Sequence, residues 1–422
     1  MKILKDINEL VQAGVISNKE AGNIRDYYRD KGELSNNRLF IVFGILGAIL
    51  VGLGFILIIA HNWDEISKIA KTSFAFLPLL LGQILCGFTL IKKRDSVVWK
   101  EGTTAFLFFA VGAVISLVSQ IYNIPGNLGS FLLLWMLLCL PLIYIMRSSV
   151  ASLLYLIGIT YYACETGYWS FHSAGTYLYW LLLLGALPHY YHLYKKKSGS
   201  NFMTFHNWII TLSIVISLGT VTDRTGELMY ISYFSLFGLF SLMGKSQFFD
   251  LQNTRNNAYK IVGSLGTIGL LLALSFDWFW MELRTGDLMY TYAIGSPEFF
   301  AAVILTLSAG VLLFFQQVKI NLTDFVFALF VPIFFLGQVS IIAVVLINVL
   351  VFMIGIFKII EGVKKDHLGI VNYGLLIITA LIVCRFFDTD LSFIFRGILF
   401  VLVGVGFFLT NYRMLKKRKT ND

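Results

Sequence analysis

Long apolar runs recur along most of this chain, and they predict helices that cross a membrane. The first run, residues 39–60, contains no charged residue. As a helix with a rise of ~1.5 Å per residue it is roughly 33 Å long, enough to cross the hydrocarbon core of a bilayer. Gly44, Ala48 and Gly52 recur at every fourth position, which leaves one face where a neighbouring helix can approach closely.

The remaining apolar runs extend the prediction to an all-α, polytopic transmembrane bundle of about 14 spans. The stretch 322–360 is divided in two, because a single helix of that length would be nearly twice as long as the hydrocarbon core is thick. The runs near 149, 207 and 322 are short, and the sequence leaves open whether they cross fully. The predicted further spans are 72–91, 102–122, 128–146, 149–164, 176–194, 207–221, 228–243, 260–281, 298–315, 322–337, 339–360, 368–384 and 391–412.

The two ends of the chain differ from this apolar middle. Residues 1–38 predict a small helical hairpin, in which Gly14 ends the first helix and a capping box from Ser17 to Glu20 opens the second. The predicted organisation is therefore a hairpin at 1–38, a helical bundle at 39–412 and a basic tail at 413–422. A weak internal repeat is a further hypothesis, since the heptapeptide at 224–230 recurs almost unchanged at 284–290. Apolar segments built from few residue types would also show such similarities by chance.

Composition and charge support a membrane protein and indicate its orientation. Apolar residues make up 57% of the chain and charged residues 14%, which excludes an ordinary soluble domain. With fourteen spans and a cytoplasmic N-terminus, 27 of the 33 Lys and Arg residues would lie on the inner side, which predicts that both termini are cytoplasmic. The net charge of +9 therefore indicates contact with the lipid bilayer, with anionic lipid at the inner face, and no nucleic-acid partner.

No catalytic, metal-binding or cofactor-binding motif is recognisable in the sequence. The four cysteines lie within or at the ends of apolar runs and lack the spacing of a metal site. No glycine-rich nucleotide loop or nucleophile motif is present either. We therefore expect no metal and no cofactor, and the sequence does not favour an enzyme.

Polar residues near one predicted membrane face form a candidate outward-facing pocket. Arg396 is the strongest candidate for a functional role, because an ionised group inside a membrane span is costly in free energy. Asp277, Asp388 or Asp390 could supply its counter-charge, and the Arg396 pair could be structural or could line a ligand cavity. The mid-span Asn348 predicts a hydrogen bond between helices. The pocket candidates are His61, Asn62, Asp64, Gln120, Glu165, Asp277, Asp388, Asp390 and Arg396.

The sequence resembles the bacterial membrane proteins of the domain of unknown function 2157 family (DUF2157). The resemblance is carried by Gly-Val-Ile-Ser at 14–17, Ala-His-Asn-Trp-Asp at 60–64 and Ser-Gln-Ile-Tyr-Asn-Ile at 119–124. Leu-Trp at 134–135 and a closing helix with Arg396 also fit. This resemblance implies a multi-pass protein of the bacterial cytoplasmic membrane, and it implies no particular activity.

Three functional hypotheses follow. The leading one is a transporter or lipid-handling protein, with its pocket built from the first, third, ninth and last predicted spans. The alternative is a non-transporting scaffold or sensor whose residues 1–38 recruit a cytoplasmic protein partner. A membrane-embedded enzyme is the third hypothesis, with His61, Asp64 and Glu165 as acid and base.

Overall fold

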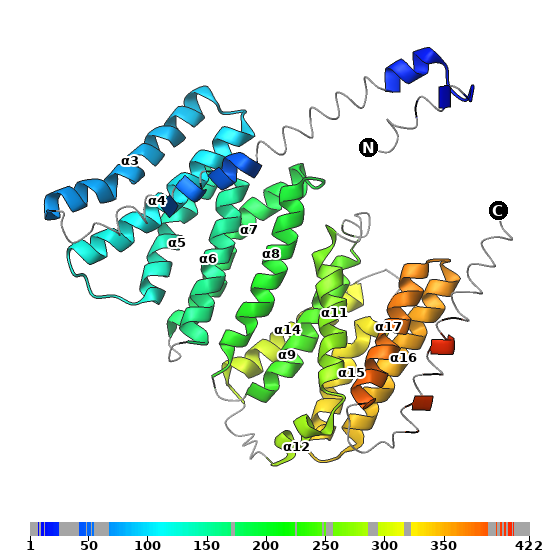
Figure 1. Cartoon of the computed structure of the whole chain (residues 1–422). Helices are drawn as coiled ribbons and strands as arrows, with labels where there is room; N and C mark the ends of the chain where they lie inside the picture. Colours follow the sequence, from blue (N-terminus) through cyan, green and yellow to red (C-terminus); the bar gives the residue numbers. More distant parts are fainter. Residues whose placement is uncertain are drawn as a thin grey trace. The chain divides into compact units, whose positions relative to one another are not determined.

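The computed structural model confirms an all-helical chain over the residues that it describes (Figure 1). These are residues 67–169, 174–223, 226–246, 256–285, 294–315 and 322–386, together with 249 and scattered positions within 7–24, 42–54 and 394–408. Thirteen α-helices and three short 3-10 helices lie within the described part of the chain. The described helices fall into two compact units. Unit 1 consists of Met1–Tyr162 and Trp180–Lys196, and unit 2 of Ala163–Tyr179 and Lys197–Asp422.

Unit 1 is built on antiparallel neighbours joined by short turns. Ser67, Ser96 and Asn127 cap the first three of these helices with their side-chain oxygens, which satisfies backbone N–H groups that have no partner within the helix. Its helices are α3 (Lys68–Lys92), α4 (Val97–Ile121), α5 (Leu128–Ile145), most of α6 (Ser149–Gly167) and most of α7 (Leu178–Lys196).

The packing of α4 on α5 shows how a small residue makes room for a large one. The Trp135 side chain donates from Nε1 to the backbone oxygen of Phe108 at 2.9 Å, and its ring lies against Gly112. A Cβ atom on Gly112 would come within 2.6 Å of that ring. Glycine is therefore required here because the aromatic ring occupies the space of a side chain.

Unit 2 has the larger core, which surrounds α9. Helices α11, α14 and α15 all pack on α9, and α16 packs on α17 (Figure 1). The helices of this unit are α8 (Asn201–Leu218), α9 (Met229–Gly244), α11 (Ala258–Ala273), α12 (Asp277–Thr285), α14 (Pro297–Phe315), α15 (Leu322–Gly337), α16 (Ile342–Lys364) and α17 (Leu368–Phe386), with the 3-10 turns η2 (Ala174–Tyr177), η3 (Gly219–Val221) and η4 (Gly226–Leu228).

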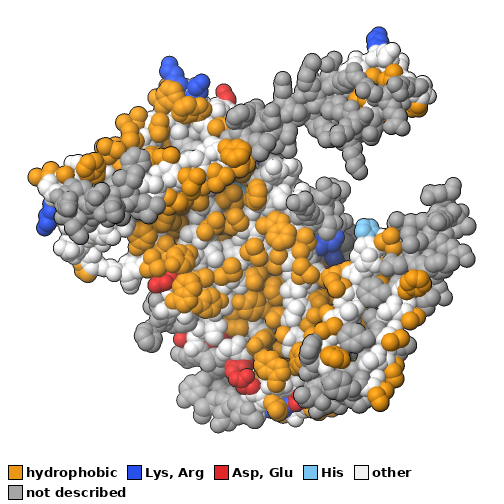
Figure 2. Space-filling model, viewed as in Figure 1, with side chains coloured by type: hydrophobic (Ala, Val, Ile, Leu, Met, Phe, Trp, Pro, Cys, Tyr) orange, Lys and Arg blue, Asp and Glu red, His pale blue; other side chains and the backbone are white. Residues whose placement is uncertain are grey.

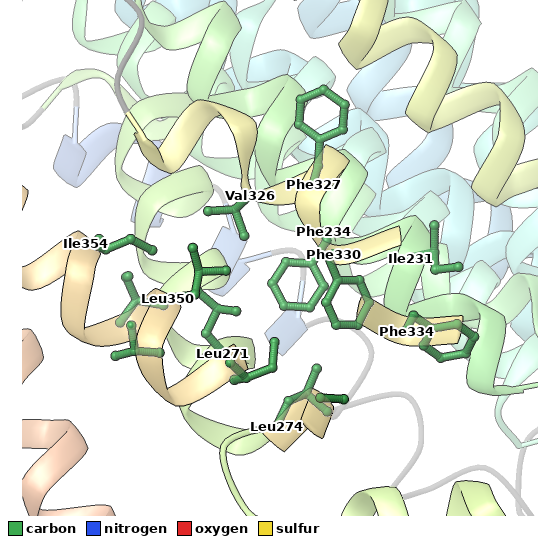
Figure 3. Close-up of a cluster of buried hydrophobic side chains, with 14 of the residues drawn as sticks. Ile231, Phe234, Leu271, Leu274, Val326, Phe327, Phe330, Phe334, Leu350 and Ile354 are labelled. Carbon is green, nitrogen blue, oxygen red and sulfur yellow. The ribbon is translucent and has the colours of Figure 1, made fainter. Parts of the chain in front are cut away.

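Aromatic side chains fill the centre of unit 2. The rings of Phe234 on α9 and Phe330 on α15 lie 4.0 Å apart between centroids, and Phe334 follows one turn later on the same face of α15 (Figure 3). Leu271 and Ile354 close the cluster from α11 and α16. In lipid these contacts stabilise the bundle through close packing, because apolar surface gains little by moving from lipid into protein.

The outer surface of the helices is apolar, as a membrane-embedded bundle requires. Leu307 and Phe314 on α14 are 63% and 84% exposed. Figure 2 shows hydrophobic side chains over much of the visible face. Exposed apolar area of this extent is rare on soluble monomers and indicates contact with lipid.

The prediction of fourteen spans is wrong. Within the described part of the chain, eight helices are long and apolar enough to cross a membrane, or nine if α11 and α12 form one bent span. Helices α6 and α7 do not qualify, because tyrosines, Glu165, histidines and lysines interrupt their apolar runs. Helix α15 has 16 residues, about 24 Å, which is short of the ~30 Å hydrocarbon core. Half of the predicted first span and most of the predicted last span lie outside the described residues.

Several other predictions from the sequence are confirmed by the structure. The predicted run 298–315 matches α14, and 128–146 matches α5 to within one residue. The N-terminal capping box is confirmed, since the Ser17 backbone N–H donates to Glu20 Oε2 at 2.8 Å and the Glu20 N–H donates to Ser17 Oγ at 3.2 Å. Gly14 has the positive φ of +71° that ends a helix. Most residues of the predicted hairpin lie outside the described part.

Candidate functional site

The most distinctive feature of unit 2 is a break between α11 and α12. The two helices meet at 73° across three residues, 274–276. The 16 residues of α11 rise about 24 Å, which is short of the ~30 Å hydrocarbon core, so a single span made of α11 and α12 has its break within that core. A break at such a depth frees backbone carbonyl groups that water satisfies poorly.

Side chains from three elements satisfy those carbonyl oxygens. The Leu274 oxygen accepts from Trp280 Nε1 at 2.8 Å, and the Ser275 oxygen accepts from Asn348 Nδ2 of α16 at 3.0 Å. The Ser275 hydroxyl donates to the Leu272 oxygen at 2.6 Å. The Asn348 bond also confirms the predicted interhelical role of this residue. The break is therefore a built feature of the fold, in which these three carbonyl oxygens are paired.

Helix α12 has one face in the core and the other exposed. Phe279, Trp280 and Leu283 are buried, whereas Trp278 and Met281 are 62% and 52% exposed. An exposed tryptophan beside polar residues is typical of a helix at the boundary between lipid and water. The sharp bend is consistent with α12 running along that boundary.

Two guanidinium groups gather around the break. Arg284 Nη2 donates to Asp277 Oδ1 at 2.6 Å, which forms an ion pair within α12. At the end of α17, Arg385 donates from Nη2 to the Ser275 hydroxyl at 3.1 Å. Its guanidinium also lies over the Phe276 ring, 4.6 Å from the centroid. The group at the break therefore carries two positive charges and one negative charge.

The same region holds a polar donor and a polar acceptor without partners among the described residues. Arg284 Nη1 and Asn348 Oδ1 are both buried atoms that make no hydrogen bond there. Such atoms are costly unless something pairs with them. A solute with a carboxylate or phosphate group and a hydrogen-bond donor has the matching chemistry.

A second buried polar group lies in unit 1. The Glu101 side chain near the start of α4 is 1% exposed, and it accepts from the Ser148 hydroxyl and from the backbone N–H groups of Ser149 and Val150. These N–H groups belong to the first turn of α6, where a helix has unpaired donors and a partial positive charge. Glu101 therefore caps α6 from another helix, which is a structural role.

A third group lies at the opposite end of unit 2 from the break. Asp324, near the start of α15, is fully buried and accepts from Lys245 Nζ at 2.5 Å and from the Ser241 hydroxyl at 3.0 Å. Lys245 directly follows α9. Burial lowers the pKa of its ammonium group, although the neighbouring Asp324 carboxylate acts in the opposite direction. This pair joins the end of α9 to the start of α15.

The structure describes three of the nine predicted pocket residues. Gln120 is exposed near the end of α4 in unit 1, whereas Glu165 is half-buried in α6 and Asp277 opens α12, both in unit 2. The other six lie outside the described residues, so the pocket as a set stays a prediction. They are His61, Asn62, Asp64, Asp388, Asp390 and Arg396.

Sequence reasoning missed most of the groups at the break. The sequence gives Arg284 and Arg385 no evident role, since they follow the predicted spans 260–281 and 368–384, and Ser275 falls inside the first of these apolar runs. A usable signal did exist in this run, because Ser275 and Asp277 stand close together at its end. Asp277 was selected for its charge, but its partner in the fold is Arg284, seven residues along the same helix.

These features define the chain as a multi-pass helical membrane protein. Residues 8–152, about a third of the chain, match the family model for predicted membrane proteins named DUF2157, which confirms the resemblance seen in the sequence. No curated protein matches the chain, and no solved structure does. The break between α11 and α12 lies outside the matched residues.

Proposed function

We propose that this protein is a transporter or lipid-handling protein that binds a small anionic group at the break between α11 and α12. The observation that carries the proposal is the broken helix with Arg385 and Arg284 beside it. Membrane transporters build solute sites from interrupted helices, because an interruption presents backbone and side-chain polar groups inside an apolar bundle. Cationic groups at such a position favour an anionic solute.

The charge at the two ends of unit 2 supports an outward-facing site. Among the described residues of unit 2, the end that holds the break carries Glu165, Asp223, Glu227, Asp277, Glu282 and Glu298 with Arg284 and Arg385, a net charge of −4. The described residues at the other end are Lys197, Lys245, Lys260, Lys358, Lys364 and Lys365 with Asp324, Glu361 and Asp366, a net charge of +3. Basic ends of membrane helices favour the cytoplasm. We therefore place the break at the outer face.

The binding step is tested with the purified full-length protein in detergent. Its thermal midpoint is measured with a panel of small carboxylates, inorganic phosphate and short-chain phospholipids. We expect at least one anion to raise the midpoint, and Arg385→Gln to abolish that rise. Lys365→Gln is the control, because Lys365 is 60% exposed at the opposite end of the unit and should leave the rise unchanged. No stabilisation by any anion would contradict the proposal.

The scaffold hypothesis remains the second candidate, with one observation in its favour. Val15 lies between the two predicted N-terminal helices and is 67% exposed, so it is available to a partner protein. Deletion of residues 1–38 separates the two functions. A solute-binding protein keeps its anion-dependent stabilisation after this deletion, whereas a scaffold loses capture of its partner and shows no anion dependence before or after it.

A further inference from the structure

Hydrogen bonds bring the basic loops of unit 1 to a single end of that unit. Glu101 at the start of α4 bonds to the start of α6, and Ser149 at that start lies 3.4 Å from Nε2 of His189 on α7. The α3–α4 turn, the α5–α6 turn and the end of α7 therefore share one side. Glu101 and His189 mark this end.

Six exposed cationic side chains crowd this end, and we call them the basic rim. They are Lys92, Lys93, Arg94, Arg147, Lys195 and Lys196. Two carboxylates accompany them, but Glu101 is buried and bonded to α6, with Lys100 Nζ 3.9 Å away. Among the described residues of unit 1, only Asp95 is an exposed carboxylate beside the rim. Figure 2 shows blue side chains, with red beside them, at the end of α3 where it turns into α4.

Exposed aromatic side chains stand beside the basic rim. Trp99 and Tyr144 are each 40% exposed, and Tyr191 is 59% exposed. The Lys195 ammonium lies 5.5 Å from the centre of the Tyr191 ring. Tryptophan and tyrosine prefer the membrane interface, because their rings are apolar at one end and polar at the other. The rim therefore lies level with phosphate groups.

We infer that the basic rim is a docking surface for anionic phospholipid headgroups. The charge complementarity is strong, because the described part of this end has six exposed cations against one exposed carboxylate. A membrane supplies phosphates at this depth with their acyl chains beside the exposed apolar faces of α3 and α5, which a soluble anion lacks. This inference depends on unit 1 being embedded in a membrane and does not depend on the solute site in unit 2.

The test uses the full-length protein and native mass spectrometry. The protein is mixed with equal amounts of phosphatidylglycerol and phosphatidylcholine, and the ratio of the two bound lipids is measured. Lys92→Gln/Lys93→Gln should lower the preference for phosphatidylglycerol by roughly fivefold for each charge removed. The matched control Lys68→Gln/Lys71→Gln removes two charges from the other end of the same helix. It should leave most of the preference intact.

Two further measurements keep the inference falsifiable. Lys92→Arg/Lys93→Arg preserves the charge and should retain the preference, which separates loss of charge from loss of folding. Inorganic phosphate at millimolar concentration should displace little of the bound lipid. Equal losses in the two Gln variants, or full displacement by inorganic phosphate, would overturn the inference.

Discussion

Asp324 is a fully buried carboxylate, and it lies in a helix too short to span a membrane by itself. Its partner Lys245 is 79 residues away in the chain, and that ammonium group is only 12% exposed. The charges compensate each other in a region of low dielectric constant, where a single charge is very costly. The pair therefore fixes the position of the end of α9 relative to the start of α15.

Removal of one partner should be more harmful than removal of both. We expect Lys245→Met to lower the free energy of unfolding by about 3 kcal/mol, because Asp324 would remain as an unpaired buried charge. The double variant Lys245→Met/Asp324→Leu should recover most of this loss. Denaturant or thermal unfolding of the detergent-solubilised protein measures both effects. A double variant no more stable than the single one would contradict this account of the pair.

Glu20 predicts a pH dependence at the N-terminal segment. Hydrogen bonds from Ser17 lower the pKa of its carboxyl group below 4.5. Because the folded-state pKa is lowered, the stabilisation is present above pH 4.5 and is lost as the pH falls through the folded-state value. Hydrogen exchange, corrected for its intrinsic pH dependence, should show the N–H groups of Ser17, Glu20 and Ala21 losing protection in that window. Glu20→Gln keeps the capping geometry without a titrating group, so the pH dependence should vanish.

For individual side chains, the sequence predicts only contacts between residues that are close together in the chain. The Ser17–Glu20 box spans three residues and could be predicted because its geometry depends on helix periodicity alone. The Lys245–Asp324 pair and the Glu101 cap join residues 79 and about 47 positions apart. Charged residues are common at the ends of helices, so none of these residues stands out in the sequence. Nothing in their immediate surroundings identifies the partner.

Helix α11 shows how closely two elements of unit 2 approach each other. A Cβ atom on Gly263 would come within 2.6 Å of the Ser241 nitrogen and 2.7 Å of the Phe237 oxygen, both backbone atoms of α9. Gly269, on the same helix, has no atom within 4 Å of that position. The two glycines therefore form a matched pair for testing the α9–α11 contact.

We expect Gly263→Ala and Gly269→Ala to differ sharply. The first should lower the free energy of unfolding by about 1–3 kcal/mol, because the two backbones must separate. The second should be neutral or slightly stabilising, since alanine favours a helix by up to about 1 kcal/mol over glycine. Thermal midpoints measured in the same detergent compare them. Equal effects of the two substitutions would contradict the close packing of α9 on α11.

The boundaries of many elements could be predicted from the sequence, because apolar runs and polar turns alternate clearly. The break between α11 and α12 could not. The run 260–281 is almost continuously apolar, and the 73° bend depends on Trp280, Asn348 and Arg385, which meet only in the folded unit. Gly337 supplies the necessary space, since a Cβ atom there would come within 2.0 Å of the Trp280 ring.

For the whole molecule, the number of spans proved harder to predict than the helices themselves. Most predicted runs are helices, but length and polarity leave eight or nine membrane-crossing candidates in the described part of the chain. The prediction that both termini are cytoplasmic depends on an even number of spans, and this number is no longer supported. The charge difference between the ends of unit 2 is independent of that count, and it now carries the proposed orientation.

Thiol labelling in intact cells tests this orientation most directly. Cys86, Cys139, Cys164 and Cys384 are replaced by serine or alanine, and a single cysteine is then introduced as Glu282→Cys at the end that holds the break or as Lys365→Cys at the opposite end. Both positions are exposed. A maleimide that cannot cross membranes should label position 282 in intact cells and position 365 only after permeabilisation. Labelling of 365 in intact cells, with 282 protected until permeabilisation, would contradict an outward-facing site at the break between α11 and α12.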